Sequence, residues 1–203
     1  MNIKHYLFIS LSVLGLASCT EADDDAFDEA GWRTLNETYF EQAYQTHTAK
    51  TATSFILPSW SQPESLTLNE IAHEKCILVD VLKKGEGSQS PFYTDTVQVH
   101  YVGRLIPTQN YFAGFEFDKS YLSTYDPDVD VPYKVSVSGV VEGFSTALQH
   151  MKRGDKWRVT VPYQLGYGTS DKSTIPAYSN LIFDVALFDF WHPGETRPVF
   201  KVR

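Results

Sequence analysis

The sequence predicts an α+β fold: an antiparallel half-barrel sheet of five to six strands wrapped on one short helix, with an N-terminal helical extension. From residue 76 onward, apolar and polar residues alternate with a period of two, as in strands that bury one face. One segment interrupts this alternation with apolar residues at helical spacing. These residues are Val141, Phe144, Leu148 and Met151. A lone helix beside one sheet is an α+β arrangement.

Residues 1–18 are expected to be a signal peptide that does not belong to the fold. Lys4 precedes an apolar run that is short for a membrane span and ends in "LASC", residues 16–19. This tetrapeptide resembles the lipobox of bacterial lipoproteins, whose cysteine carries the lipid. We therefore expect lipidation at Cys19, which would anchor the protein to a membrane through acyl chains. The alternative is an ordinary signal peptide with a chance cysteine.

Residues 19–30 are expected to form an acidic tether, because "TEADDD" follows the cysteine. Two interpretations stay open: a solvated tether, or an acidic export signal of the kind that sends some lipoproteins to the outer face of the outer membrane. The expected localisation is the cell envelope, with the protein lipid-anchored to the outer membrane and either periplasmic or surface-exposed.

Residues 31–75 are expected to form a helical extension and a linker. Residues 27–49 predict one amphipathic helix with an apolar stripe. The stripe consists of Trp32, Leu35, Tyr39, Phe40, Ala43 and Tyr44. Packing of this stripe on the same chain is favoured and gives a monomer, whereas packing on another copy gives a weak dimer. After the helix, "ILPSWSQPES" is interpreted as a connector because of its prolines and serines.

Residues 76–203 are expected to form the sheet domain. The predicted strands lie in "CILVDVLKKGEG", "DTVQVHYVGRL", "FEFDKS", "YKVSVSG", "KWRVTVP" and "NLIFDVALFDFW". In the second predicted strand, Val97 and Val99 face one side of the sheet while Gln98 and His100 face the other. One face of the sheet is expected to lie in water. The last strand is apolar on both faces, as a central strand would be. The helix lies between the fourth and fifth strands.

The short helix begins with Val140 and Val141 rather than with a polar capping residue. A single helix against a curved sheet leaves a gap beside the helix N-terminus, and a valine pair keeps that gap dry. The free N–H groups of the first turn point into it, together with the positive end of the helix dipole. A dry aromatic slot with a few amide donors suits an apolar ligand that carries a carbonyl group.

Composition and motifs exclude several classes of function. The formal charge of −8 argues against nucleic acid as a partner, because phosphate binding needs clustered Lys and Arg. The six histidines are scattered without metal-ligand spacing, so neither a metal site nor a cofactor is expected. Nucleophilic Ser/His/Asp catalysis lacks its characteristic turn motif. Cys76 lies in an apolar run and is expected to be a buried small side chain rather than a nucleophile.

In order and spacing, several segments between about residues 77 and 191 resemble the FKBP-type peptidyl-prolyl isomerases, the macrolide-binding immunophilins. The segments are "VHYVGRL", "FEFDKSY", "VVEGFSTALQHMKRGDKWRVTVP", "LGYG" and "IPAYSNLIFDVAL". The resemblance implies the FKBP-like fold, rotation about X–Pro bonds as the activity, and Pro-containing polypeptides as substrates. Such rotation makes and breaks no covalent bond, so it needs no nucleophile, metal or proton relay.

The resemblance also implies which side chains line the slot. Three residues are expected to act on the substrate bond: Tyr167 through its hydroxyl, Val141 through its N–H, and Asp118 by shaping the pocket. The remaining contacts are expected from Tyr101, Phe117, Tyr133, Val140, Phe144, Ile175 and Phe183. A plainer interpretation makes Phe117, Phe183 and Val141 ordinary core residues. Likewise, Asp118 could be a buried carboxylate that holds a tyrosine hydroxyl.

The sequence departs from the family pattern at the floor and rim of the slot. Phe144 stands where many members carry tryptophan, so affinity for macrolide inhibitors is expected to be weakened. Tyr133 stands at a usual phenylalanine position and adds a hydroxyl at the rim. The loops "STYDPDVDVP" and "IPTQNYFAGFE" are longer than usual, and either restrict the peptides that enter or cover a sheet edge.

Three functions are compatible with these features. The favoured one is a lipid-anchored prolyl isomerase that assists the folding of exported proteins. The second is a non-catalytic FKBP-like module that binds Pro-containing peptides or an apolar ligand at the cell envelope. The third is an interaction protein that works through the aromatic stripe of residues 32–44.

Overall fold

The computed structural model describes residues 28–121 and 130–195 of the 203-residue chain. The expected signal peptide, Cys19 and most of the acidic tether lie outside the described residues, as does most of "STYDPDVDVP". The helices and strands are α1 (Glu29–His47), β1 (Ser54–Pro58), β2 (Cys76–Lys83), β3 (Thr96–Arg104), β4 (Glu116–Lys119), β5 (Tyr133–Ser136), α2 (Glu142–His150), β6 (Lys156–Val161) and β7 (Leu181–Trp191).

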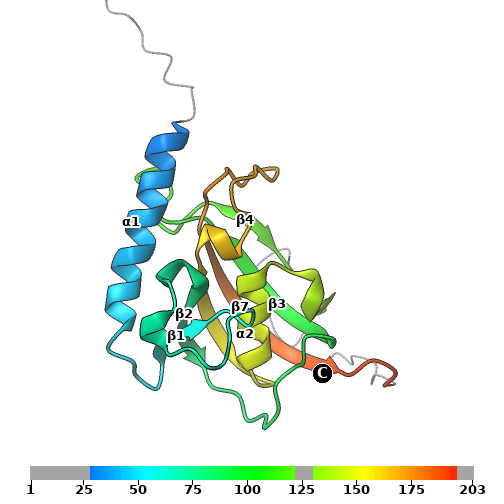
Figure 1. Cartoon of the computed structure of the whole chain (residues 1–203). Helices are drawn as coiled ribbons and strands as arrows, with labels where there is room; N and C mark the ends of the chain where they lie inside the picture. The colour runs from blue at the N-terminus through cyan, green and yellow to red at the C-terminus, as the bar shows by residue number, and fades with distance from the viewer. Residues whose placement is uncertain (1–27, 122–129, 196–203) are drawn as a thin grey trace, which may run out of the picture.

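Within the described residues, seven strands form one antiparallel sheet in the order β1-β2-β6-β7-β3-β4, with β5 paired to β3. The strand β7 lies between β6 and β3, the central place that its two apolar faces predict. Figure 1 shows α2 in front of this sheet and α1 along one side of the domain. The predicted α+β fold class is confirmed.

The strand β1 was not expected, because its sequence lies at the start of the predicted connector. It pairs with β2, with Phe55 opposite Val79 and Leu57 opposite Ile77. The segment "SFILP" is short, lacks alternation and ends in a proline, so its sequence resembles a linker. An edge strand tolerates Pro58 because one side of it needs no hydrogen-bonded neighbour. The sheet therefore has one strand more than the five to six predicted.

The helix α2 packs against the sheet through its apolar stripe, as the spacing of its apolar residues predicts. Phe144, Leu148 and Met151 are at most 4% exposed and belong to the main core cluster with residues of β2, β6 and β7. Val141 is the N-cap and makes no side-chain capping hydrogen bond. The α2 dipole therefore ends at an apolar entrance rather than at a polar cap.

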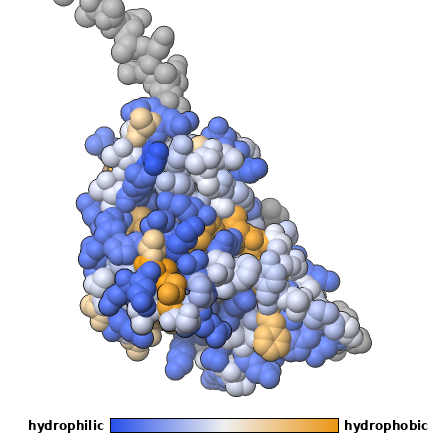
Figure 2. Space-filling view, viewed as in Figure 1, coloured by the Kyte–Doolittle hydropathy of each residue, from blue (hydrophilic) through white to orange (hydrophobic). Residues whose placement is uncertain are grey.

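The helix α1 packs on its own chain, which was the favoured expectation. Phe40 and Tyr44 are each 5% exposed and form a second cluster with residues of β1 and β2. The outward side of α1 is mostly hydrophilic in Figure 2. The assignment of Leu35 to the buried stripe was wrong, because its side chain is 46% exposed. The neighbouring residue Asn36 is fully buried instead. The hydropathy pattern missed Asn36 because a polar residue is ordinarily assigned to the solvent side.

The sheet face opposite α2 is less open to water than expected. Gln98 and His100 are each only 2% exposed, because the curved sheet and neighbouring side chains cover this part of β3. The ring of Phe188 on β7 lies edge-on to His100 at 6.5 Å between centroids. Burial lowers the pKa of His100 below its usual range.

Candidate functional site

A pocket of about 380 Å³ opens between the N-terminus of α2 and one end of the sheet. It is lined by Val99, Tyr101, Phe117, Asp118, Tyr133, Val135, Gly139, Val140, Val141, Phe144, Tyr167 and Phe183. The strands β3, β4, β5 and β7 supply most of the walls, and α2 supplies the floor. The pocket therefore forms where the apolar entrance to α2 predicts a slot.

Aromatic rings that meet edge to face build the floor and walls. The ring centroid of Phe144 lies 4.8 Å from that of Phe183, and the ring centroid of Phe117 lies 5.7 Å from that of Phe183. Tyr101 lies 6.0 Å from both Phe144 and Tyr133. Edge-to-face packing fixes each ring against the next. The floor is closed, since Phe144 is 4% exposed, whereas Tyr133 stands at the rim with 50% exposure.

Tyr101 and Asp118 form the main polar contact inside the wall. The hydroxyl of Tyr101 donates to Oδ2 of Asp118 at 2.6 Å, and Oδ1 of Asp118 accepts from the N–H of Lys119 at 2.8 Å. Burial, with the Asp118 hydrogen bond and charge, raises the pKa of Tyr101 well above its ordinary value. Asp118 thus holds the Tyr101 hydroxyl, as considered from the sequence, but as an exposed residue rather than a buried carboxylate.

Tyr167 reaches the pocket from the turn after the 3-10 helix Tyr163–Leu165. The N–H groups on both sides of it, those of Gly166 and Gly168, donate to the carbonyl of Tyr163 at 3.0 and 2.8 Å. Gly168 has a φ of 65°, a conformation that favours glycine. Tyr167 is 39% exposed, and partial burial with the charge of Asp118 raises the pKa of its hydroxyl. A neutral hydroxyl therefore faces the pocket and can donate.

The start of α2 supplies a second donor. The N–H of Val141 makes no hydrogen bond to any acceptor in the described part of the chain. It lies at the positive end of the helix dipole, beside the aromatic floor. An amide and a phenol at the edge of a closed apolar floor can bind a carbonyl oxygen while an apolar ring occupies the floor.

Nine of the ten slot residues predicted from the sequence line this pocket. The exception is Ile175, which is 6% exposed and part of the core, with its N–H donated to the carbonyl of Lys172. A substrate contact for Ile175 stays a prediction. The nine residues come from six separate stretches of sequence, which only the fold makes neighbours.

Sequence reasoning missed Gly103, which lies beneath the aromatic wall. A Cβ at this position would stand 2.5 Å from Cζ of Phe117 and 2.9 Å from Cε1 of Phe183. The absence of a side chain therefore lets both rings approach β3 closely. The available signal was a glycine inside the strand pattern, which often marks a close approach by another group.

Within residues 28–121 and 130–195, no three His, Cys, Asp or Glu side chains are grouped so that they could hold a metal ion. None of the helices in the same ranges has the length and apolar character needed to cross a membrane.

The family model described as FKBP-type peptidyl-prolyl cis-trans isomerase matches residues 87–188, half of the chain. The "Macrophage infectivity potentiator" of Trypanosoma cruzi is 29% identical over 96% of this chain and 87% of its own length. The "FKBP-type 22 kDa peptidyl-prolyl cis-trans isomerase" of Escherichia coli K12 is 37% identical over 54% of this chain and 47% of its own length. The chain thus spans most of the first relative but less than half of the second.

Two solved structures share the fold. A peptidyl-prolyl cis-trans isomerase from Pseudomonas syringae matches with a TM-score of 0.54 and 26% identity, over 82% of this chain and 97% of its own. FkpA from Escherichia coli matches with a TM-score of 0.55 and 28% identity, over 80% of this chain and 61% of its own. The similarity therefore extends beyond the segment that the family model covers.

Proposed function

The chain belongs to the family of FKBP-type peptidyl-prolyl cis-trans isomerases, and from this premise we propose that it accelerates X–Pro bond isomerisation in the pocket at the start of α2. One observation carries the proposal: an aromatic floor and two directed donors, the Val141 N–H and the Tyr167 hydroxyl, converge on one cavity. The substrates are Pro-containing segments of polypeptides that are still folding.

The chemistry needs only a change of environment around the bond. Rotation about a peptide bond has a barrier of roughly 18–20 kcal/mol, because it destroys the amide resonance. A twisted amide carries less charge separation than a planar one, so an apolar pocket binds the twisted form better than water does. Only such preferential binding of the transition state accelerates the reaction.

The residues divide this work between them. The Val141 N–H binds a substrate carbonyl, and the Tyr167 hydroxyl donates to a carbonyl as the proline nitrogen becomes pyramidal. The rings of Phe144, Phe117 and Phe183 enclose the proline ring and exclude water. Asp118 holds Tyr101 in place and transfers no proton.

A proline-isomerisation assay on soluble protein starting at residue 20 tests this function. We expect a rate above the uncatalysed one on several X–Pro peptides, and a loss of about two- to tenfold in Tyr167→Phe, the worth of one hydrogen bond. Asp118→Ala is expected to lose activity as well. The control is Leu35→Ala, which alters an exposed side chain on the outward side of α1.

The same assay can contradict the proposed activity. If the wild-type rate equals the uncatalysed rate on every peptide, the proposed activity is wrong. Peptides that nevertheless bind, with affinity lost in Phe183→Ala, would then support the non-catalytic module.

We further propose that the protein is lipid-anchored at Cys19 in the cell envelope and acts there on exported proteins. The support is the sequence "LASC" after an apolar run. Growth with labelled palmitate is expected to label the wild type and not Cys19→Ser. Label in both proteins, or in neither, would contradict the proposal.

We also propose that the protein is a monomer. The support is that Phe40 and Tyr44, the centre of the α1 stripe, are buried on their own chain. Light scattering of the protein from residue 20 onward is expected to give the mass of one chain, and a dimer mass would contradict this.

A further inference from the structure

Two buried asparagines join α1 to the segment that carries Tyr167. Asn36 on α1 is fully buried and Asn180 is 1% exposed. The N–H of Asn180 donates to Oδ1 of Asn36 at 2.8 Å, and Nδ2 of Asn180 donates to the carbonyl of Asn36 at 2.6 Å. Two hydrogen bonds, both donated by Asn180 and accepted by Asn36, therefore fix the geometry of the pair, and breaking them leaves buried polar groups without partners.

Asn180 also forms a hydrogen bond with Tyr163, at the other end of the segment that carries Tyr167. Its Oδ1 accepts from the N–H of Tyr163 at 2.9 Å, which closes residues 163–180 into a loop. The carbonyl of Tyr163 in turn accepts from Gly166 and Gly168, the two residues beside Tyr167. The N–H of Tyr178 donates to the carbonyl of Gly168 at 2.9 Å. A continuous series of hydrogen bonds therefore runs from α1 to the two residues that flank Tyr167.

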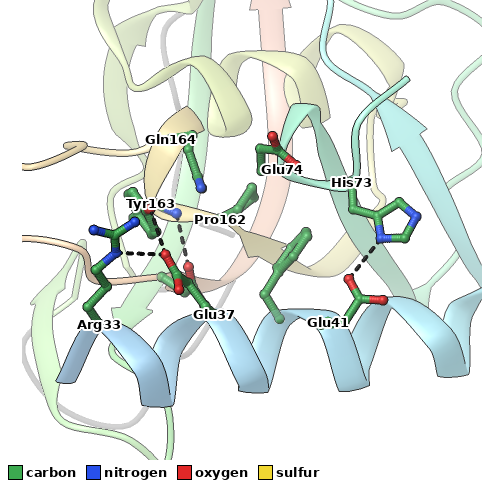
Figure 3. Close-up of a pocket in the computed structure, with 10 residues that line it drawn as sticks. Arg33, Glu37, Glu41, His73, Glu74, Pro162, Tyr163 and Gln164 are labelled. Carbon is green, nitrogen blue, oxygen red and sulfur yellow. Dashed lines mark hydrogen bonds and ion pairs between the residues drawn. The ribbon is translucent and has the colours of Figure 1, made fainter. Parts of the chain in front are cut away.

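Three further contacts from α1 reach the same loop. The indole N–H of Trp32 donates to Oγ of Ser179 at 3.0 Å. The hydroxyl of Tyr163 donates to Oε1 of Glu37 at 3.1 Å, across a hollow of about 510 Å³ beside α1 (Figure 3). Arg33 bonds the same Glu37 oxygen at 2.8 Å and lies over the ring of Tyr178. One face of α1 thus holds both ends of the loop.

We infer that α1 positions Tyr167 in the pocket and that Asn36 is the positioning residue. This inference rests on the proposed function, since the position of the Tyr167 hydroxyl matters for catalysis only if it bonds the substrate. Asn36 itself lies outside the pocket lining and touches no substrate. It acts by fixing Asn180 and, through Tyr163, the backbone on both sides of Tyr167.

A double-mutant cycle separates this role from a merely structural one. We compare kcat/KM for the wild type, Asn36→Ala, Tyr167→Phe and the double variant. Asn36→Ala is expected to lose about threefold or more, and Tyr167→Phe in that background to cost much less than in the wild type, because groups in one hydrogen-bond network are coupled. If the fold-loss in kcat/KM of the double variant equals the product of the two single losses, the two residues are not coupled and the inference is overturned.

The matched control is Tyr44→Leu, a buried α1 residue that contacts the β1–β2 region and not the loop. We expect Tyr44→Leu to lower the melting temperature. Its effect on kcat/KM should be independent of Tyr167→Phe, so that the fold-loss of the double variant equals the product of the two single losses. If Tyr44→Leu is coupled to Tyr167→Phe as strongly as Asn36→Ala is, the effect of Asn36 comes from a general loss of stability and the inference is overturned. Where Asn36→Ala does not fold, Trp32→Phe removes one donor to the loop but keeps a ring, and the same cycle applies.

Amide hydrogen exchange provides a readout that does not depend on activity. The N–H groups of Gly168 and Tyr178 are expected to exchange faster in Asn36→Ala than in the wild type and in Tyr44→Leu. If the wild type is inactive but this exchange changes, the proposed function fails and the positioning of Tyr167 by α1 stands. If exchange at both amides is unchanged, the inference is overturned whatever the activity.

Discussion

The hydroxyl of Tyr101 on β3 donates to the carboxylate of Asp118 on β4 at 2.6 Å, and this bond ties together two neighbouring walls of the pocket. The same carboxylate raises the pKa of Tyr167, after the larger effect of burial. One exposed acid therefore holds the hydroxyl of one phenol and further disfavours ionisation of a second phenol, which is already neutral at pH 7.

The first prediction concerns this bond. Tyr101→Phe keeps the ring but removes the hydroxyl, so we expect a loss of about two- to tenfold in kcat/KM, with stability lowered by about 1 kcal/mol. Isomerisation kinetics and chemical denaturation measure the two effects. Since this hydrogen bond joins Tyr101 and Asp118, Asp118→Ala in the Tyr101→Phe background should cause little further loss in kcat/KM. A full additional loss would show that Asp118 acts on the substrate in another way.

The second prediction concerns Gly103. In Gly103→Ala the new methyl group meets Phe117 and Phe183 well inside contact distance, so both rings must move. Overpacking of this kind typically destabilises a protein by about 1–3 kcal/mol, and here it also distorts the pocket wall. We expect a lower melting temperature and a lower kcat/KM in the folded protein. Full activity would mean that the rings shift without changing the pocket.

The third prediction concerns the pocket floor. Phe144 is nearly buried and lies against Phe183, so Phe144→Trp adds both volume and an indole N–H at this place. We expect tighter binding of a macrolide inhibitor, measured by calorimetry, and some loss of stability from the larger ring. An unchanged macrolide affinity would show that the longer loops rather than the floor limit binding.

The fourth prediction is a pH dependence of stability. Nδ1 of His192 lies 2.8 Å from Oδ1 of Asp95, whose side chain is fully buried. This hydrogen bond raises the pKa of His192 above its ordinary value of 6.5, which means that the folded state favours the charged ring. The stabilisation is fully present below about pH 6.5 and is lost as the pH rises through the folded pKa.

His192→Ala tests this dependence. Thermal denaturation across pH should show a difference from the wild type at pH 6 that shrinks at higher pH. A difference that grows with pH would contradict the assignment of a charged His192 to the folded state.

The fifth prediction concerns Cys76, the cysteine that the sequence assigns to the core. Its side chain is fully buried, and burial raises its pKa to about 11. We therefore expect slow alkylation by iodoacetamide at pH 8 in the native protein from residue 20 onward, and fast alkylation after denaturation. Mass spectrometry follows the reaction, and fast labelling of the native state would contradict the buried assignment.

Local patterns predicted the pocket better than they predicted its support. Phe144 and the valine pair could be placed because helical spacing and a missing polar cap are visible within a dozen residues. Ile175, by contrast, is not among the residues that line the pocket and is 6% exposed, so its contact with substrate stays a prediction; the direction of a loop side chain depends on the whole loop. The strand β1 was missed because an edge strand needs no alternation when its partner, β2, supplies the pairing.

The α+β plan, the place of the lone helix and the apolar entrance to it can be inferred from the amino-acid sequence, because periodicity and capping act between near neighbours in the chain. The inward position of Asn36 is visible only in the folded protein. Its partner Asn180 lies 144 residues away, and a hydropathy pattern assigns an isolated asparagine to solvent. A buried polar residue is stable only with its partner in place, so its role exists in the fold and not in the local sequence.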